Sequence, residues 1–202
     1  LIGTFHSIGA TFLRQNATKV GLMPNFSIFD TDDSENLIKE LLVEQNIDVK
    51  QIRPKAISYF ISAAKNEMIS PGNFRNHYGG FIEDIVADIY PLYQKQLKAQ
   101  NSVDFGDLLY LTVKLLSENK EVLEKYQEMY KYMMIDEYQD TNNAQYMFAR
   151  LLSEKYKNIC VVGDDDQGIY AWRGADIKNI QSFEKDFENV KIVKLEQNYR
   201  SS

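Results

Sequence analysis

Two short stretches decide the fold: YMMIDEYQD at residues 132–140 and NICVVGDDDQG at residues 158–168. In each, a short apolar run ends in acidic residues, and a helical pattern at about 143–155 lies between them. A third apolar run, 190–195, follows a second helical pattern at about 176–187. Strands that alternate with helices predict an α/β unit with a parallel sheet.

The sequence before these strands is dominated by helical spacing of apolar residues. The pattern predicts a helix over 4–15, a helix capped by Ser34, a helix after Pro54 and a long helix over 81–100 that contains Pro91. Residues 70–80 are predicted to form a loop, and Asp104 to cap a helix that runs to about 116. The chain is therefore predicted to have a helical section, about 20–105, ahead of three strands of an α/β core.

Composition sets limits on the class of protein. The 202 residues are enough for one core, or one core with a smaller lobe, and no apolar run approaches the ~20 residues that span a bilayer. The net charge of −6 differs from the basic surface of many nucleic-acid binders. Cys160 lies in an apolar run and is expected to be a buried thiol in a reducing cytoplasm. One cysteine and two histidines make no zinc cluster.

Acidic residues at strand ends are candidates for nucleotide chemistry, because ligands of open α/β sheets bind beyond the carboxyl ends of the strands. A carboxylate such as Asp136 can hold Mg²⁺, and the adjacent Glu137 can activate a water for attack on a γ-phosphate. Gln167, after the second strand, can sense a phosphate. Taken singly, each stretch is a weak signal, and an ordinary junction between a strand and a solvated turn is the alternative.

A second group of candidates is aromatic and basic. Tyr170, Trp172 and Arg173 form a cluster of the kind on which bases stack, although a lone Trp beside Arg also suits a core or an interface. Arg200 follows the third apolar run, where an Arg can bind a transferring phosphoryl group or make a surface ion pair.

Three stretches in order, IDEYQDTN (135–142), VVGDDDQGIYAWRGADI (161–177) and LEQNYRS (195–201), resemble consecutive motifs of the UvrD/Rep/PcrA family of superfamily-1 DNA helicases. The opening TFHS (4–7) resembles an earlier DNA-contacting motif of that family. Residues 93–94 and 104–109 resemble its YQ…DFDDLL segment, with Gly106 where an Asp is usual. Gly168 stands where the family usually has Ser. The resemblance covers essentially the whole chain.

The resemblance implies an α/β fold: a partial RecA-like P-loop NTPase sheet, parallel, with helices on both faces, plus a mostly helical inserted subdomain. Residues 1–22 and 105–202 would belong to the first motor domain, and residues 23–104 would form the inserted subdomain that contacts duplex DNA. The implied site residues are Asp136 for Mg²⁺, Glu137 as catalytic base, Gln167 and Arg200 at the γ-phosphate, Tyr199 at the adenine, Tyr170, Trp172 and Arg173 at single-stranded bases, and Thr4, Phe5 and His6 on the DNA track. Read alone, His6 is also compatible with a structural role.

The resemblance implies an ATP- and Mg²⁺-dependent 3′–5′ helicase that acts on single-stranded DNA and on single-strand/duplex junctions. Repair or replication proteins are its expected partners, and its expected location is the cytoplasm, with the bacterial nucleoid. None of the ten glycines is followed by Lys, so the chain contains no P-loop. Because it also opens at Leu1 and stops directly after a motif, we expect it to be a piece of a longer protein and inactive alone. A non-catalytic binding module, or the helicase section of a helicase–nuclease, are the alternatives.

Overall fold

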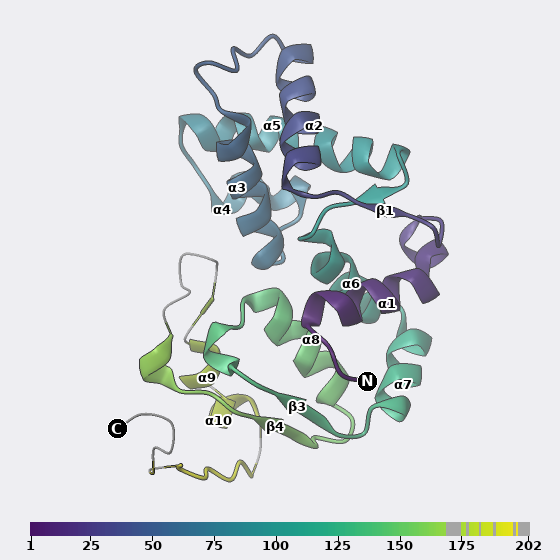
Figure 1. The fold of residues 1–202 in the computed structure, drawn as a ribbon, viewed down its shortest axis with the longest axis vertical. Helices are drawn as coiled ribbons and strands as arrows, with labels where there is room; N and C mark the ends of the chain where they lie inside the picture. Colours follow the sequence, from purple (N-terminus) through teal and green to yellow (C-terminus); the bar gives the residue numbers. More distant parts are fainter. Residues whose placement is uncertain (169–174, 177, 182, 188, 196, 198–202) are drawn as a thin grey trace.

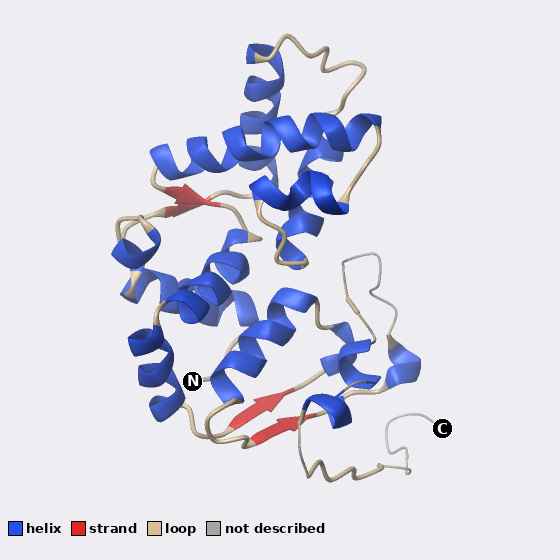
Figure 2. Cartoon of the chain, turned by 180° about the vertical axis from the view of Figure 1, so that it is seen from behind, coloured by secondary structure: helices blue, strands red, loops and turns tan. Residues whose placement is uncertain are grey.

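A computed structural model describes residues 1–168, 175–176, 178–181, 183–187, 189–195 and 197. Within these ranges the chain is mostly helical and has two small parallel sheets of two strands each (Figures 1 and 2). A helical body lies at one end of the molecule, and strands β3 and β4 lie at the other (Figure 1). No described helix is long and apolar enough to cross a membrane.

The helical body is built by α2 (Thr31–Glu44), α3 (Pro54–Asn66), α4 (Phe74–His77) and α5 (Phe81–Ala99). Their apolar faces enclose one core, in which Ile38, Ile57 and Tyr90 are fully buried. The predicted helices are confirmed here, and Pro91 lies within the single helix α5. The predicted Ser34 cap is wrong: α2 begins three residues earlier, where Asp30 and Asp33 form a reciprocal capping box.

The predicted loop over 70–80 is also partly wrong, since it contains a 3₁₀ turn, η2 (Pro71–Asn73), and α4. Phe74 is fully buried in α4 and stacks on Tyr78 with ring centroids 4.6 Å apart. Burial of this aromatic ring against the body stabilises a helical turn that local sequence, rich in Gly and Asn, does not favour.

A second core lies below the body and is formed by α1 (Phe5–Gln15), the 3₁₀ turn η1 (Ala17–Val20), α6 (Asp107–Glu118), α7 (Lys120–Met129) and α8 (Asn143–Ser153). Phe12 of α1 stacks on Tyr126 of α7, with ring centroids 3.7 Å apart and an interplanar angle of 6°. The backbone of α1 comes close to α6 at Gly9, where an added Cβ would lie 2.5 Å from the Leu108 carbonyl oxygen.

Strands β1 (Ser27–Ile28) and β2 (Ser102–Val103) pair in parallel where the chain enters and leaves the helical body. The two ends of the body are therefore fixed side by side. Asp104 follows β2 directly, and α6 begins at Asp107 after Gly106. As predicted, the Asp104 side chain caps the start of this helix: its Oδ1 accepts from the Asp107 backbone N–H at 2.8 Å, and the Asp107 carboxylate accepts in return from the Asp104 N–H at 3.3 Å.

The second sheet pairs β3 (Met133–Ile135) with β4 (Ile159–Val161) in parallel, with Met133 opposite Ile159 and Ile135 opposite Val161. Both strands were predicted, as was α8 between them. The third predicted strand is wrong: residues 190–195 form no strand, and Ile192, Val193 and Leu195 are exposed. An apolar run becomes a strand only when a neighbouring strand accepts and donates its backbone hydrogen bonds, and no described strand lies beside it.

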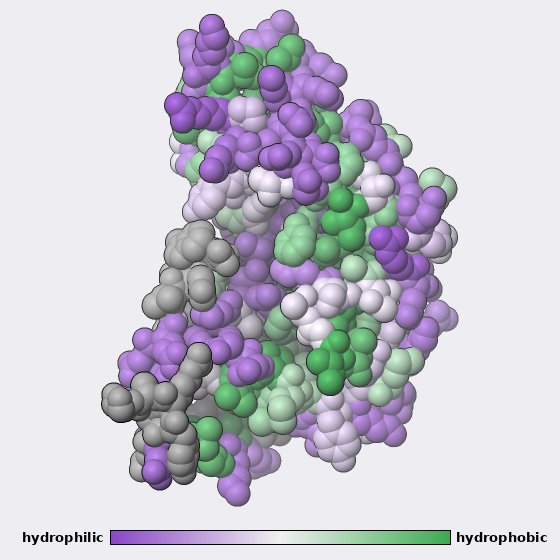
Figure 3. Space-filling view, viewed as in Figure 1, coloured by the Kyte–Doolittle hydropathy of each residue, from purple (hydrophilic) through white to green (hydrophobic). Residues whose placement is uncertain are grey.

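A helix was predicted over about 176–187, and the described residues of this stretch include two short helices, α9 (Lys178–Gln181) and α10 (Phe183–Asp186). Cys160, expected to be buried, is exposed, because its side of β4 has no covering element among the described residues. On the face shown in Figure 3 the helical body is largely hydrophilic, whereas apolar patches lie over the half that holds the sheet.

Candidate functional site

The acidic ends of β3 and β4 lie at the same edge of the sheet, because the two strands run parallel and in register. Asp136 and Glu137 follow β3, and both are exposed. The Glu137 backbone N–H donates to Asp136 Oδ1 at 2.9 Å, and the described residues provide no partner for the second Asp136 oxygen. The geometry therefore presents two carboxylates beyond a strand end, where nucleotide ligands of such sheets bind.

Glu137 has a left-handed backbone, with φ 50° and ψ 45°. This conformation costs a residue with a side chain roughly 1–2 kcal/mol, so neighbouring bonds have to hold it. The next residue, Tyr138, donates its N–H to the Val162 carbonyl at 2.9 Å, and the Asp140 N–H donates to the Glu137 carbonyl at 2.9 Å. The 3₁₀ turn η3 (Tyr138–Asp140) follows, with the Tyr138 ring buried against Phe183 of α10.

The buried side chain of Gln139 links the two strand ends. Its Nε2 donates to Glu137 Oε2 at 2.8 Å, and its Oε1 accepts from the Asp164 backbone N–H at 3.1 Å. Asp164 follows β4 and accepts from Gln167 Nε2 at 2.6 Å. The structure therefore brings together three of the predicted catalytic residues, Asp136, Glu137 and Gln167, and shows a connecting residue that sequence reasoning missed.

The predicted DNA-track residues lie at the start of α1. Thr4 caps the helix by accepting from the Ser7 N–H at 3.2 Å, and Phe5 packs on Phe148 of α8. A cavity of about 370 Å³ is lined by residues 3–6 together with residues 133–136 of β3 and its end. The opening motif and the first acidic strand end therefore border one cavity, although they are 130 residues apart in sequence.

His6 stacks face to face on Phe105, with ring centroids 4.1 Å apart and an interplanar angle of 20°. Burial lowers the pKa of His6 to about 4, so its imidazole is neutral at physiological pH. Phe105 is 60% exposed, which is unusual for a Phe and leaves one flank of the stack open to a ligand. The sequence analysis did not select Phe105 as a site residue. The available signal was its aromatic side chain in the turn between Asp104 and Asp107.

The remaining predicted site residues lie outside the described residues. These are Tyr170, Trp172 and Arg173, expected at single-stranded bases, and Tyr199 and Arg200, expected at the nucleotide.

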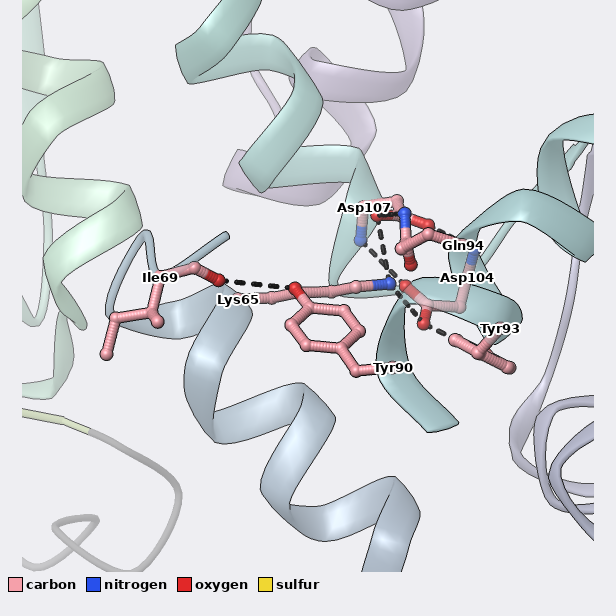
Figure 4. Close-up of polar contacts among 7 residues, drawn as sticks. All are labelled: Lys65, Ile69, Tyr90, Tyr93, Gln94, Asp104 and Asp107. Carbon is pink, nitrogen blue, oxygen red and sulfur yellow. Dashed lines mark hydrogen bonds and ion pairs between the residues drawn. The ribbon is translucent and has the colours of Figure 1, made fainter. Parts of the chain in front are cut away.

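A buried ionic cluster joins the helical body to the second core (Figure 4). Lys65 of α3 is fully buried, and its Nζ lies 2.6 Å from Asp104 Oδ2 and 2.9 Å from Asp107 Oδ1. Two side chains of α5 complete the cluster: Tyr93 donates to Asp104 at 3.0 Å, and Gln94 donates to Asp107 at 3.1 Å. Every charge in the cluster has a partner, which is the condition for burying charge at tolerable cost.

Two carboxylates share one cation in this cluster, and their pKa values diverge. Burial and the charge of Asp104 raise the pKa of Asp107 to about 6. Burial opposes ionisation of Asp104 as well, but Lys65 and the donated hydrogen bonds lower its pKa. At Gly106, an added Cβ would lie 3.0 Å from Lys65 Cδ, so a larger residue there would require the buried lysine side chain to shift by a few tenths of an ångström.

The donor set at the strand ends suits a hard cation. Mg²⁺ takes one or two carboxylates and completes its shell with water and phosphate oxygens, and Asp136 offers one exposed carboxylate of this kind. Nearby, burial and the charge of Glu137 raise the pKa of Asp140. No group of three His, Cys, Asp or Glu side chains that could form an all-protein metal site occurs among the described residues.

Residues 1–188 match the family model described as the UvrD/REP helicase N-terminal domain. The helical body, both small sheets and the acidic strand ends described above therefore lie within a UvrD/REP helicase N-terminal domain. The chain belongs to the UvrD/REP helicase family.

Known relatives agree with this assignment. The chain is 50% identical over 201 residues to the ATP-dependent DNA helicase PcrA of Bacillus subtilis, and 45% identical to the proteins of the same name from Staphylococcus epidermidis and Staphylococcus aureus. All of the chain is covered in these alignments, but it spans only 27% of the length of the Bacillus protein and 28% of the Staphylococcus proteins.

Proposed function

We propose that these residues supply the catalytic carboxylates and part of the DNA track of an ATP-dependent 3′–5′ DNA helicase. The main support for this proposal is the parallel register of β3 and β4, which puts Glu137 and Gln167 at one edge of the sheet. Hydrogen bonds through Gln139 and Asp164 connect the two residues. A docking module that had lost catalysis has no need of this connection. Membership of the helicase family supports the same reading.

In the proposed mechanism Glu137 accepts a proton from the attacking water, and Asp136 would hold Mg²⁺, which would neutralise negative charge on the phosphate oxygens. ATP, when bound with that ion, supplies the phosphoryl group whose loss drives the motor. Gln167 donates a hydrogen bond to the γ-phosphate when ATP is present and to Asp164 when it is not. Arg200 stabilises negative charge on the phosphoryl group, and Tyr199 stacks near the adenine.

We further propose that DNA runs past the start of α1. Thr4, Phe5 and His6 line this track, and the exposed face of Phe105, stacked on His6, extends it. Bases stack on aromatic faces without regard to sequence, at about 1–3 kcal/mol per base. Tyr170, Trp172 and Arg173 would continue the track.

The domain arrangement proposed for the chain has residues 1–22 and 105–202 in a RecA-like motor domain and residues 23–104 in an inserted subdomain that contacts duplex DNA. The two separate cores and the β1–β2 pairing where the chain crosses between them support this division. Since the 202 residues contain no P-loop, we propose that they do not hydrolyse ATP by themselves.

The test compares ATPase and unwinding activities of the full-length helicase that carries these residues with those of the 202-residue chain. Glu137→Gln is expected to lower DNA-stimulated ATP hydrolysis by ~10³-fold or more while ATP binding is kept, because the variant lacks the base but not the ligands. Glu128→Gln is the matched control, since Glu128 is a carboxylate of α7 that pairs with Lys155. Normal hydrolysis by Glu137→Gln, or robust turnover by the 202-residue chain, contradicts the proposal.

DNA binding is tested separately by fluorescence anisotropy with a short single strand at two salt concentrations. Trp172→Ala and Phe105→Ala are each expected to weaken binding about 5- to 100-fold, the loss of one stacked base. Phe81→Ala is the control, because Phe81 is 76% exposed and begins α5 in the helical body, whereas α1 belongs to the second core. Unchanged affinity for single-stranded DNA in both variants would contradict the proposed DNA track.

A further inference from the structure

Among the described residues, Gln139 is the buried side chain that forms hydrogen bonds with both acidic strand ends. It is 2% exposed, and its two amide atoms make bonds of opposite kind. The Glu137 carboxylate can only accept a hydrogen bond, and the Asp164 backbone N–H can only donate one. The amide orientation is fixed by this chemistry, since a flipped amide would face donor with donor and acceptor with acceptor.

Glu, Leu and Lys would each fail to satisfy one or both of these neighbours. A Glu would keep the acceptor for Asp164 but would place a second negative charge against Glu137. A Leu of similar length would leave the Asp164 N–H without its acceptor, and a Lys would offer no acceptor at all. The residue type is therefore determined by the need to connect a carboxylate to a backbone donor across the ends of two strands.

The fit around Gln139 is tight on the β4 side. A Cβ added at Gly163 would lie 2.7 Å from Gln139 Oε1 and 2.8 Å from Ile180 Cδ1. Gly163 therefore allows the Gln139 amide to reach the Asp164 N–H. On the β3 side, Glu137 has a left-handed backbone conformation, and its carboxylate accepts the hydrogen bond from Gln139.

We infer that Gln139 is a positioning residue for the proposed hydrolysis: it orients the Glu137 carboxylate and couples that orientation to the Asp164–Gln167 turn. A movement of Gln167 away from Asp164 frees an Asp164 carboxylate oxygen, and the turn that carries Asp164 also carries the backbone N–H bound to Gln139. A change at the second strand end is thus transmitted to the base at the first through one side chain. This inference rests on the proposed function, in which Glu137 is the base.

The experiment measures steady-state ATP hydrolysis, binding of a non-hydrolysable ATP analogue, and backbone hydrogen exchange in the full-length helicase that carries these residues. Gln139→Leu is expected to lower kcat about 10- to 100-fold, the usual effect of removing a group that orients a working side chain, with analogue affinity changed less than about threefold. Hydrogen exchange over residues 161–168 should become faster, because the Asp164 N–H loses its acceptor.

Gln139→Glu separates the two bonds and guards against a folding defect in the Leu variant. It keeps an acceptor for the Asp164 N–H, so exchange over 161–168 should stay near that of the wild type. It removes the donor to Glu137, so kcat should still fall at least tenfold, at constant analogue affinity. Gln127→Leu is the matched control: Gln127 is a buried glutamine of α7 whose Nε2 donates to the Leu151 carbonyl at 2.7 Å, far from the strand ends.

The outcomes separate this inference from the proposed function. If Glu137→Gln abolishes hydrolysis but both Gln139 variants keep wild-type kcat, the positioning role is wrong and the proposed function stands. If the Gln139 variants lose analogue affinity as much as kcat, Gln139 only supports the fold, and the inference is again overturned. If Glu137→Gln itself hydrolyses ATP normally, the proposed function fails first. A fall in kcat alone, in both variants and not in Gln127→Leu, supports the inference.

Discussion

The buried cation Lys65 allows a sharp test of what joins the helical body to the second core. In Lys65→Met the side chain keeps much of its length and packing but loses its charge. Asp104 and Asp107, whose side chains are 10% and 1% exposed, would then face each other without a cation. Breaking a buried ion pair by removing one partner costs about 3–5 kcal/mol, because the charge left behind is uncompensated.

That cost is large beside the roughly 5–15 kcal/mol of free energy that separates folded from unfolded domains. For a chain of this length it corresponds to a fall in Tm of roughly 6–20 °C, at about 2–4 °C per kcal/mol. Urea-induced unfolding followed by circular dichroism measures the difference directly. Lys114→Met is the control, since Lys114 of α6 is about half exposed and makes only a long i,i+4 pair with Glu118, so less than about 0.5 kcal/mol is expected.

The pH dependence of the stability difference between wild type and Lys65→Met provides a second test of the cluster. Without Lys65, both carboxylates have folded-state pKa values above their unfolded values, so the variant is destabilised increasingly as pH rises through that interval. The stability gap between wild type and Lys65→Met should therefore be smaller at pH 5 than at pH 7.5. A gap below 1 kcal/mol at pH 7.5, equal to that of Lys114→Met, would refute the role given to the cluster.

Three further predictions concern other contacts. The folded-state pKa of His6 is about 4, below its ordinary 6.5, so its contribution to the free energy of unfolding is present above pH 6.5 and is lost as pH falls toward 4. Between pH 7.5 and 5, wild type should therefore lose on the order of 1–2 kcal/mol more stability than His6→Gln. Parallel curves of stability against pH for the two proteins would contradict this prediction. Gly9→Ala should cost about 1–3 kcal/mol in urea unfolding because its Cβ would press on the Leu108 carbonyl, whereas Gly72→Ala, with open space around it, should change little. Asn142→Ala removes the capping box of α8 and should cost about 1 kcal/mol by the same assay; an unchanged midpoint would show that the cap is dispensable.

The long helices of the body, α2, α3 and α5, could be predicted from sequence because each has an apolar face repeated at helical spacing over ten or more residues. Their beginnings were less predictable: Asp30 and Ser34 are both good caps, and only the reciprocal bonds of Asp30 with Asp33 select the first. The apolar run over 190–195 has the composition of a strand, but strand formation also requires a neighbouring strand, and local sequence does not show whether one is present. Cys160 is exposed for a related reason, since burial of a strand face requires a layer over it.

The sequence by itself determined that acidic residues follow two short strands, that aromatic and basic residues come next, and that the order of these stretches matches one helicase family. These are properties of neighbouring residues, which sequence order preserves. Only the tertiary structure decided that Gln139 reaches both strand ends, that Phe105 stacks on His6, and that Lys65 meets Asp104 and Asp107 in a buried cluster. The physical reason is that hydrogen bonds, ion pairs and ring stacking act only over a few ångströms. The partners of Lys65 and His6 come from segments that only folding brings together.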